Sequence, residues 1–91
     1  MRVIELTGTF RRTRSLRAPI GSREDLALRA AIRQLASERY PIPGPRDREA
    51  FRTPAGTCWW RRISDTALVV HYTFVSPVVR ILAVLEKPAG D

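Results

Sequence analysis

The residues with the clearest chemical potential are two tryptophans followed by two arginines: Trp59, Trp60, Arg61 and Arg62. A guanidinium is planar, stays charged and binds phosphate oxygens in pairs, while an indole can stack on an unpaired base. The same residues could instead form an ordinary strand, with the indoles in the core and the charges in solvent. Strand neighbours point to opposite faces, so one tryptophan–arginine pair must serve each face.

His71 is the only histidine, and so the only side chain whose ordinary pKa suits proton transfer near neutrality. Along residues 67–74 it alternates with an apolar set: Leu68, Val70, Tyr72 and Phe74. If that set packs on helices, then Tyr72 is a core residue and His71 looks onto the open face of the sheet. A lone histidine in a strand can also be purely structural, so both roles stay open.

The chain has a strong excess of positive charge. Its formal net charge is +7, and every basic residue except Lys87 is an arginine. A field of one sign attracts polyanions or an acidic protein partner. The alternative is a solvated basic surface with no such role.

Size and composition bound the class of protein. With 91 residues, of which 44% are hydrophobic, the chain fits one small domain that can bury a core. No apolar run approaches the roughly 18–20 residues that span a bilayer, and the N-terminus is too short and strand-like for a signal peptide. Cys58 is alone and has no set of zinc ligands around it, so we expect a cytoplasmic protein without metal or other cofactor.

The front half of the chain predicts one strand and two helices. A β-rich run, Val3–Thr7, ends at Gly8. A short basic helix is expected over Phe10–Arg17, because Pro19 interrupts any continuation. A longer helix follows, capped by Ser22, with acidic residues in its first turn that suit the helix dipole. Its apolar residues recur at spacings of three and four: Leu28, Ala31, Ile32, Leu35 and Ala36.

The back half is predicted to be β-rich after a long loop. Residues 40–56 are rich in proline, and loops of this length are often functional. Strands are expected over residues 57–63, 67–74 and 78–86, and the last is apolar enough to lie mid-sheet. The expected fold is an α+β two-layer sandwich. Its antiparallel sheet would join the N-terminal strand to a three-stranded C-terminal meander, with one short and one long helix packed on one face.

Three C-terminal stretches, together with this element order, carry a resemblance to a known family. They read WWRRI, LVVHYTF and VVRILAVL: a basic strand, a strand with a late tyrosine and an apolar strand. In these features the chain resembles the RelE/ParE superfamily of bacterial type II toxin–antitoxin toxins. The resemblance covers most of the chain and implies one RelE/ParE-like domain over residues 1–91, held inactive by an acidic antitoxin protein.

The resemblance implies one of two activities. RelE-like members enter the ribosomal decoding site and cut mRNA, whereas ParE-like members inhibit DNA gyrase and are not nucleases. RNA cleavage by such a fold uses no metal, so side chains must move the protons and stabilise the charged transition state. ParE-like members usually have two long helices. Only one is expected here, so we expect a RelE-like mRNA endoribonuclease, with the gyrase inhibitor as the alternative.

The resemblance also assigns roles to residues. In RelE-like toxins the basic strand faces the mRNA, and the family pattern favours Arg62, with Trp60 on the same face. Trp59 and Arg61 then share the helix-packed face. The residues expected to be catalytic are His71, Arg62, Arg80 and Lys87. The residues expected to bind nucleic acid are Trp60, Arg61, Arg11, Arg12 and Arg14.

The chain departs from the pattern of the nuclease members in three places. Residues 67–69 read Ala-Leu-Val where those members commonly have an arginine. The tail EKPAGD lacks a tyrosine or a basic cluster, and Glu86 places a negative charge where phosphate would approach. A catalytically inactive basic domain that binds nucleic acid or a partner is therefore the third hypothesis.

Overall fold

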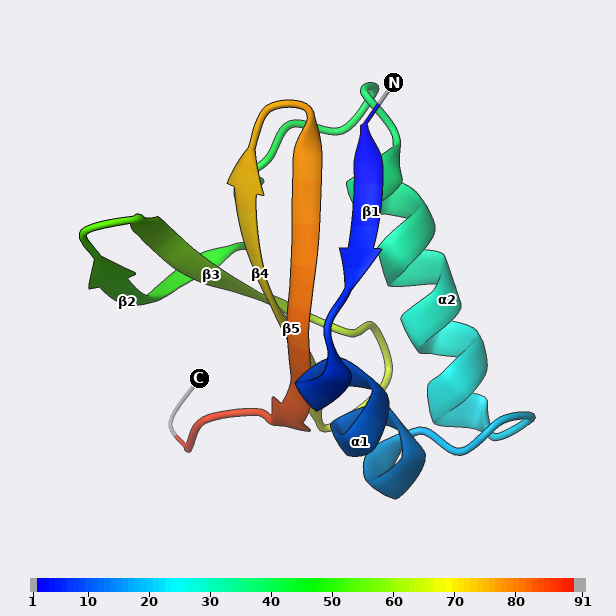
Figure 1. Ribbon diagram of the computed structural model, residues 1–91. Coiled ribbons are helices and arrows are strands. Elements are labelled where there is room, and N and C mark those ends of the chain that lie inside the picture. The colour runs from blue at the N-terminus through cyan, green and yellow to red at the C-terminus, as the bar shows by residue number, and fades with distance from the viewer. Residues whose placement is uncertain (1, 90–91) are drawn as a thin grey trace.

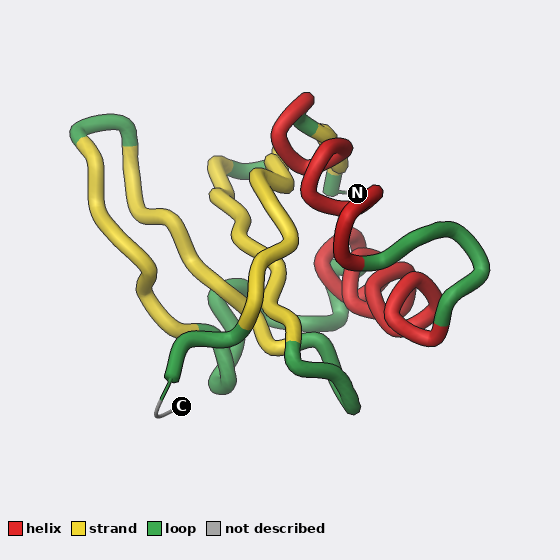
Figure 2. Tube along the Cα trace, turned by 90° about the horizontal axis from the view of Figure 1, so that it is seen from below, coloured by secondary structure: helices red, strands yellow, loops and turns green. Residues whose placement is uncertain are grey.

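The computed structural model describes residues 2–89 and shows an α+β fold of two helices and a five-stranded sheet (Figure 1). In chain order the elements are β1 (Val3–Leu6), α1 (Gly8–Arg17), α2 (Arg23–Ala36), β2 (Arg48–Thr53), β3 (Gly56–Arg62), β4 (Leu68–Val75) and β5 (Val78–Glu86). Figures 1 and 2 show both helices toward one side of the molecule and the β2–β3 hairpin projecting from the other. The predicted α+β class is confirmed.

The sheet is mixed, with the strand order β1-β5-β4-β3-β2. The strands from β2 to β5 form an antiparallel meander, but β1 runs parallel to β5 and pairs Glu5 with Arg80. The predicted all-antiparallel sheet is therefore wrong at this edge. Two helices and the strands β2 to β4 separate β1 from β5 in the chain, and so long a crossover permits a parallel pairing that strand patterns cannot reveal.

The predicted loop over residues 40–56 is wrong in its second half, because residues 48–53 form the edge strand β2. This strand pairs with β3 through a tight turn that ends at Gly56, whose φ is +136°. All of its residues except one are exposed, so its sequence shows no alternation of apolar and polar residues. Backbone pairing with β3, rather than burial of side chains, makes it a strand.

Both predicted helices are confirmed, with one boundary shifted. Thr7 belongs to the cap of α1 rather than to β1, because its Oγ1 accepts the Phe10 N–H at 3.1 Å. The helix therefore begins at Gly8, two residues before the predicted start. Ser22 caps α2 as predicted, since its Oγ accepts the Asp25 N–H at 3.0 Å.

The core lies between the helices and one face of the sheet. Phe10 of α1 and three residues of α2 bury their side chains with residues of β4 and β5. The buried members are Phe10, Ala18, Leu28, Ala31, Leu35, Ile63, Leu68, Val70, Tyr72, Val79, Ile81 and Val84. The predicted helix-facing set on β4 is confirmed, with Phe74 only partly buried. The strand β5 lies between β1 and β4, as its apolar composition predicted.

A buried carboxylate joins the two helices. Asp25 is 1% exposed, and it accepts the Gly21 N–H at 3.0 Å. Arg14 of α1 and Arg29 of α2 each donate to it at 3.2 Å. The Gly21 hydrogen bond lowers the pKa of Asp25, and these arginines lower it further, against the opposing effect of burial. Arg14, which was predicted to bind nucleic acid, is thus engaged within the fold.

We expect Asp25→Asn to be less stable than the wild type at pH 7, with a difference that shrinks in acid. A carboxyl whose folded-state pKa lies below its ordinary value of 3.8 stabilises the fold above that pH, and this stabilisation is lost as the pH falls. Urea midpoints measured at pH 7 and at about pH 3 test this. A difference that is independent of pH would contradict the role of the charge.

Candidate nucleic-acid interface

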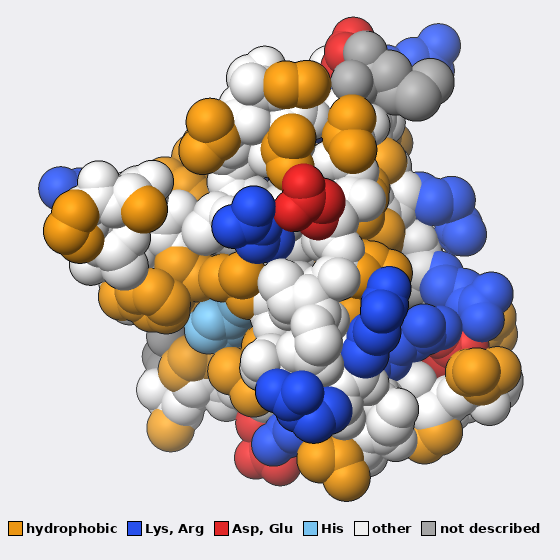
Figure 3. Space-filling view, viewed as in Figure 1, with side chains coloured by type: hydrophobic (Ala, Val, Ile, Leu, Met, Phe, Trp, Pro, Cys, Tyr) orange, Lys and Arg blue, Asp and Glu red, His pale blue; other side chains and the backbone are white. Residues whose placement is uncertain are grey.

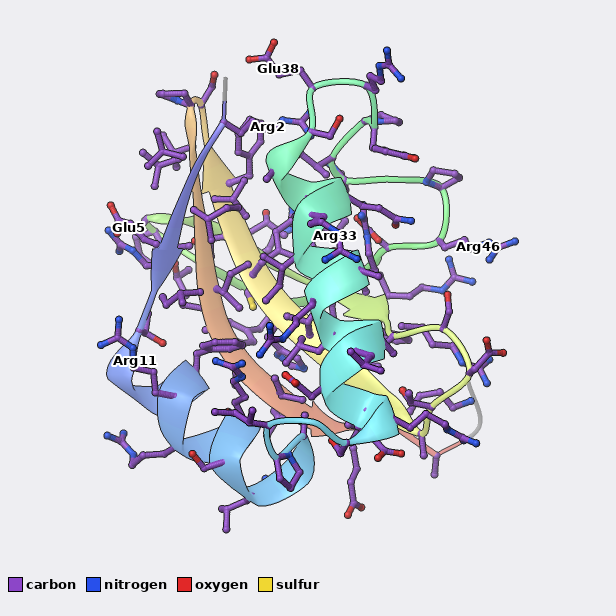
Figure 4. All side chains as sticks on the ribbon, turned by 90° about the vertical axis from the view of Figure 1, so that its right-hand side faces the viewer. Arg2, Glu5, Arg11, Arg33, Glu38 and Arg46 are labelled. Carbon is purple, nitrogen blue, oxygen red and sulfur yellow. The ribbon has the colours of Figure 1, made fainter. Side chains whose placement is uncertain are left out.

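A groove of about 1040 Å³ lies between the loop before β2, the end of β3 and the β3–β4 turn. Its basic lining residues are Arg23, Arg46, Arg48, Arg61, Arg62 and Lys87, and its acidic ones are Asp47 and Asp65. These six cations and two carboxylates leave a net charge of +4, more than half of the +7 of the whole chain. Figure 4 shows Arg46 projecting outward from its loop.

An ion pair fixes one wall of the groove. Both oxygens of the Asp47 carboxylate accept hydrogen bonds from Arg61, Oδ1 from Nε at 2.7 Å and Oδ2 from Nη2 at 2.9 Å. Asp47 Oδ2 also accepts the hydroxyl of Tyr72, and the guanidinium lies 6.0 Å from the centroid of that ring. The side chains of Asp47 and Arg61 are 1% and 11% exposed. Arg61 is therefore engaged within the wall of the groove, and little of its side chain is exposed for the predicted contact with nucleic acid.

Burial and charge shape the ionisation of this cluster. Burial alone would lower the pKa of Arg61, but the hydrogen bonds and charge of Asp47 outweigh it and raise the pKa. Burial also raises the pKa of the Tyr72 phenol, and the adjacent Asp47 carboxylate raises it further. Arg61 therefore stays charged and Tyr72 stays neutral through the physiological range.

The predicted alternation of the tryptophan–arginine doublets is confirmed. Trp59 packs against the core and pairs in register with Tyr72, while Trp60 pairs with His71 on the face opposite the helices. Arg62 is exposed on that same face. Trp60 is nevertheless only 8% exposed, so little of its indole is free to stack on a base. Tyr40, which sequence reasoning left out, is the more accessible aromatic in the groove at 46% exposure.

His71 lies on the predicted face but outside the groove lining. It is half-buried, and its Nδ1 is 4.0 Å from the Sγ of Cys58. Figure 3 shows hydrophobic side chains next to the histidine. Burial lowers its pKa, which favours the neutral imidazole over the charged form.

The remaining predicted residues divide between two places. Lys87 lines the groove, and its backbone N–H donates to the Ala67 carbonyl at 2.8 Å. Arg80 lies outside the groove lining and forms an ion pair with Glu5 at 3.1 Å, with both side chains about half exposed. Arg11 and Arg12 lie exposed on α1, also outside the groove. The structure therefore brings Trp60, Arg61, Arg62 and Lys87 together, and the catalytic roles stay predictions.

The sequence-based prediction missed five charged residues of the groove, and three of them are consecutive: Arg46, Asp47 and Arg48. In the sequence these three residues form the stretch RDR, which places a carboxylate between two cations within the proline-rich loop. An acidic residue in such a setting is either solvated or paired, and its partner Arg61 is 14 positions away in sequence. Only packing of the loop onto β3 makes the pair visible.

The described part of the chain adds two further findings. Among residues 2–89, neither helix combines the length and the hydropathy that crossing a bilayer requires. Within the same range, no three His, Cys, Asp or Glu side chains are placed to hold a metal ion.

Comparison of the chain with protein-family models, with curated proteins and with solved structures finds no match.

Proposed function

We propose that the protein is the toxin of a RelE/ParE-type toxin–antitoxin pair, and that it acts in the RelE-like way, as an endoribonuclease on ribosome-bound mRNA. The observation that carries the proposal is the groove with its net charge of +4. A strand, two helices and a C-terminal antiparallel meander also keep the element order on which the resemblance rests. The helix α1 has only 10 residues, which favours the RelE-like branch over the gyrase inhibitors with two long helices.

The exposed cations of the groove suit a phosphodiester chain. Arg46, Arg48 and Arg62 are exposed, and Lys87 lies beside them. Guanidinium and ammonium groups bind phosphate and neutralise the charge that develops during cleavage. In this proposal Arg62 and Lys87 contact the scissile phosphate, and the exposed ring of Tyr40 stacks on a base. An acidic antitoxin would bind the protein through the same excess of positive charge.

A second candidate function is RNA binding without cleavage. The groove lining contains no histidine, and its one buried carboxylate, Asp47, is paired with Arg61. The groove lining therefore lacks the residue type that most often serves as a general base near neutrality. Without a general base in the groove, cleavage would depend on charge stabilisation alone. The two hypotheses therefore differ in whether the RNA is cut and not in how tightly it is bound.

Expression in a bacterium tests these alternatives. We expect growth arrest with cut mRNA for the wild type, and restored growth for Arg62→Ala combined with Lys87→Ala. The single variant His71→Ala decides whether the half-buried histidine takes part in the cleavage of mRNA. DNA damage and an SOS response without mRNA cleavage would indicate a gyrase inhibitor instead. RNA binding by the purified protein without growth arrest would support the inactive domain. If the protein caused no growth arrest and bound no RNA, the proposed function would be refuted.

A further inference from the structure

We propose that Asp47 is a positioning residue of the groove, which anchors its loop so that Arg46 and Arg48 can contact phosphate. This inference rests on the proposed binding of RNA in the groove. It assigns to a carboxylate a favourable role in binding a polyanion, although the direct effect of its charge is repulsive.

The contacts of Asp47 tie the loop to the sheet. Its carboxylate accepts two hydrogen bonds from Arg61 of β3, one from the Tyr72 hydroxyl of β4 and one from the Gly44 N–H at 2.8 Å. Its backbone N–H donates to the Gly44 carbonyl at 3.0 Å. Residues 44–47 thus form a closed turn whose side-chain anchor is 1% exposed.

Gly44 permits the loop to lie directly on the ion pair. A Cβ at this position would be 3.1 Å from Nη2 of Arg61 and 3.3 Å from the Pro41 carbonyl oxygen, both closer than nine in ten contacts that Cβ atoms make. The turn is therefore packed onto the guanidinium as well as hydrogen-bonded to Asp47. Both contacts depend on Arg61 being held in place.

The Asp47 anchor positions the two arginines that flank it in the sequence. Arg46 and Arg48 are both exposed and line the groove, and Arg48 pairs in register with Trp60 of β3. If the turn detached, binding would have to order the loop and both long side chains anew, which opposes association. The anchor therefore supports phosphate binding without touching the ligand.

Asp65 is a matched control for the charge. It is an exposed carboxylate of the same groove, and it takes no part in the Asp47–Arg61–Tyr72 cluster. Its φ of 63° is compatible with asparagine, which adopts the left-handed region readily. Asp47→Asn and Asp65→Asn remove the same charge, so the two variants separate the anchor from electrostatics. Tyr72→Phe removes one hydrogen bond to Asp47 without changing the charge.

The experiment measures binding of a short fluorescein-labelled single-stranded RNA at several salt concentrations, below the unfolding temperature of every variant. Asp47→Asn should weaken binding about tenfold, from the cost of ordering two arginine side chains. It should also lower the slope of log affinity against log salt by about 0.7 for each lost phosphate contact. Tyr72→Phe should weaken binding about threefold, and Asp65→Asn should strengthen it about threefold.

Each contrary result has one meaning. If the wild type does not bind this RNA, this inference fails, whereas the proposed function is refuted only if expression also causes no growth arrest. If the wild type binds but Asp47→Asn binds as tightly or more tightly, only the anchor is refuted. Weaker binding with an unchanged salt slope also refutes it, because no phosphate contact of Arg46 or Arg48 is then lost with the anchor. If Asp47→Asn does not fold, Tyr72→Phe decides, and unchanged affinity overturns the inference.

Discussion

Replacing Arg61 with alanine should lower the free energy of unfolding by about 3–5 kcal/mol, the usual cost of removing one partner of a buried ion pair. The Asp47 side chain is 1% exposed, and without Arg61 its carboxylate would keep the Gly44 N–H and the Tyr72 hydroxyl but lose its countercharge. Small domains are stable by about 5–15 kcal/mol, so this is a large share of the total. Urea unfolding followed by tryptophan fluorescence measures the change.

Arg62→Ala is the matched control, since it removes the same side chain one position further along β3. Arg62 is exposed and points to the other face, so its loss should change the free energy of unfolding by less than about 0.5 kcal/mol. The double variant Arg61→Ala with Asp47→Ala should cost less than the sum of the two single changes, because no unpaired charge is left. Equal effects of Arg61→Ala and Arg62→Ala would show that the pair does not stabilise the fold.

Reversing two groove charges, Arg62→Glu with Lys87→Glu, should weaken RNA binding about a hundredfold at low salt. Each reversal changes the interaction with an adjacent phosphate by about 1–2 kcal/mol, and about 1.4 kcal/mol is tenfold in affinity. The salt dependence should fall as well, because two contacts that release counterions are lost. Fluorescence anisotropy with a labelled single-stranded RNA measures both quantities.

Arg11→Glu with Arg12→Glu makes the same change in net charge outside the groove. Both residues are exposed on α1, so their reversal alters the overall field but not the groove lining. A loss of less than about threefold is expected, in line with a screened long-range effect. If this variant binds as weakly as the groove variant, binding follows total charge, and the sequence-based prediction for Arg11 and Arg12 gains support over the groove.

The face opposite the helices is less open than its position in the sheet indicates. Cys58, Trp60, Val69 and Ala83 do not belong to the main core, yet each of them is buried. His71, which pairs in register with Trp60 and Ala83, is consequently half-buried with a lowered pKa. Alternation predicts which way a strand residue points, but its exposure depends on what lies beside it. For this reason the exposed groove at the end of β3, and not the middle of the sheet, is the candidate site.

Local patterns in the sequence determined most of the elements and the faces of their residues. The Ser22 cap and the apolar stripe of α2, the apolar run of β5 and the alternation on β4 each reflect contacts within a few residues of one another. Such contacts repeat with the geometry of a helix or a strand, so residue types at fixed spacings reveal them. The separation of Trp59 with Arg61 from Trp60 with Arg62 followed from the same rule.

Only the tertiary structure decided the features that depend on residues far apart in the chain. The strand β2 forms because its backbone pairs with β3, and its side chains show no alternation of apolar and polar residues from which a strand could be predicted. The parallel pairing of β1 with β5 depends on how two helices cross over. Strand alternation predicted the face of Arg61 but not its partner Asp47, 14 positions earlier in the chain, and a desolvated charge is stable only where such a partner is held against it. Packing thus placed Arg61 in the wall of the groove and left the adjacent Arg62 exposed.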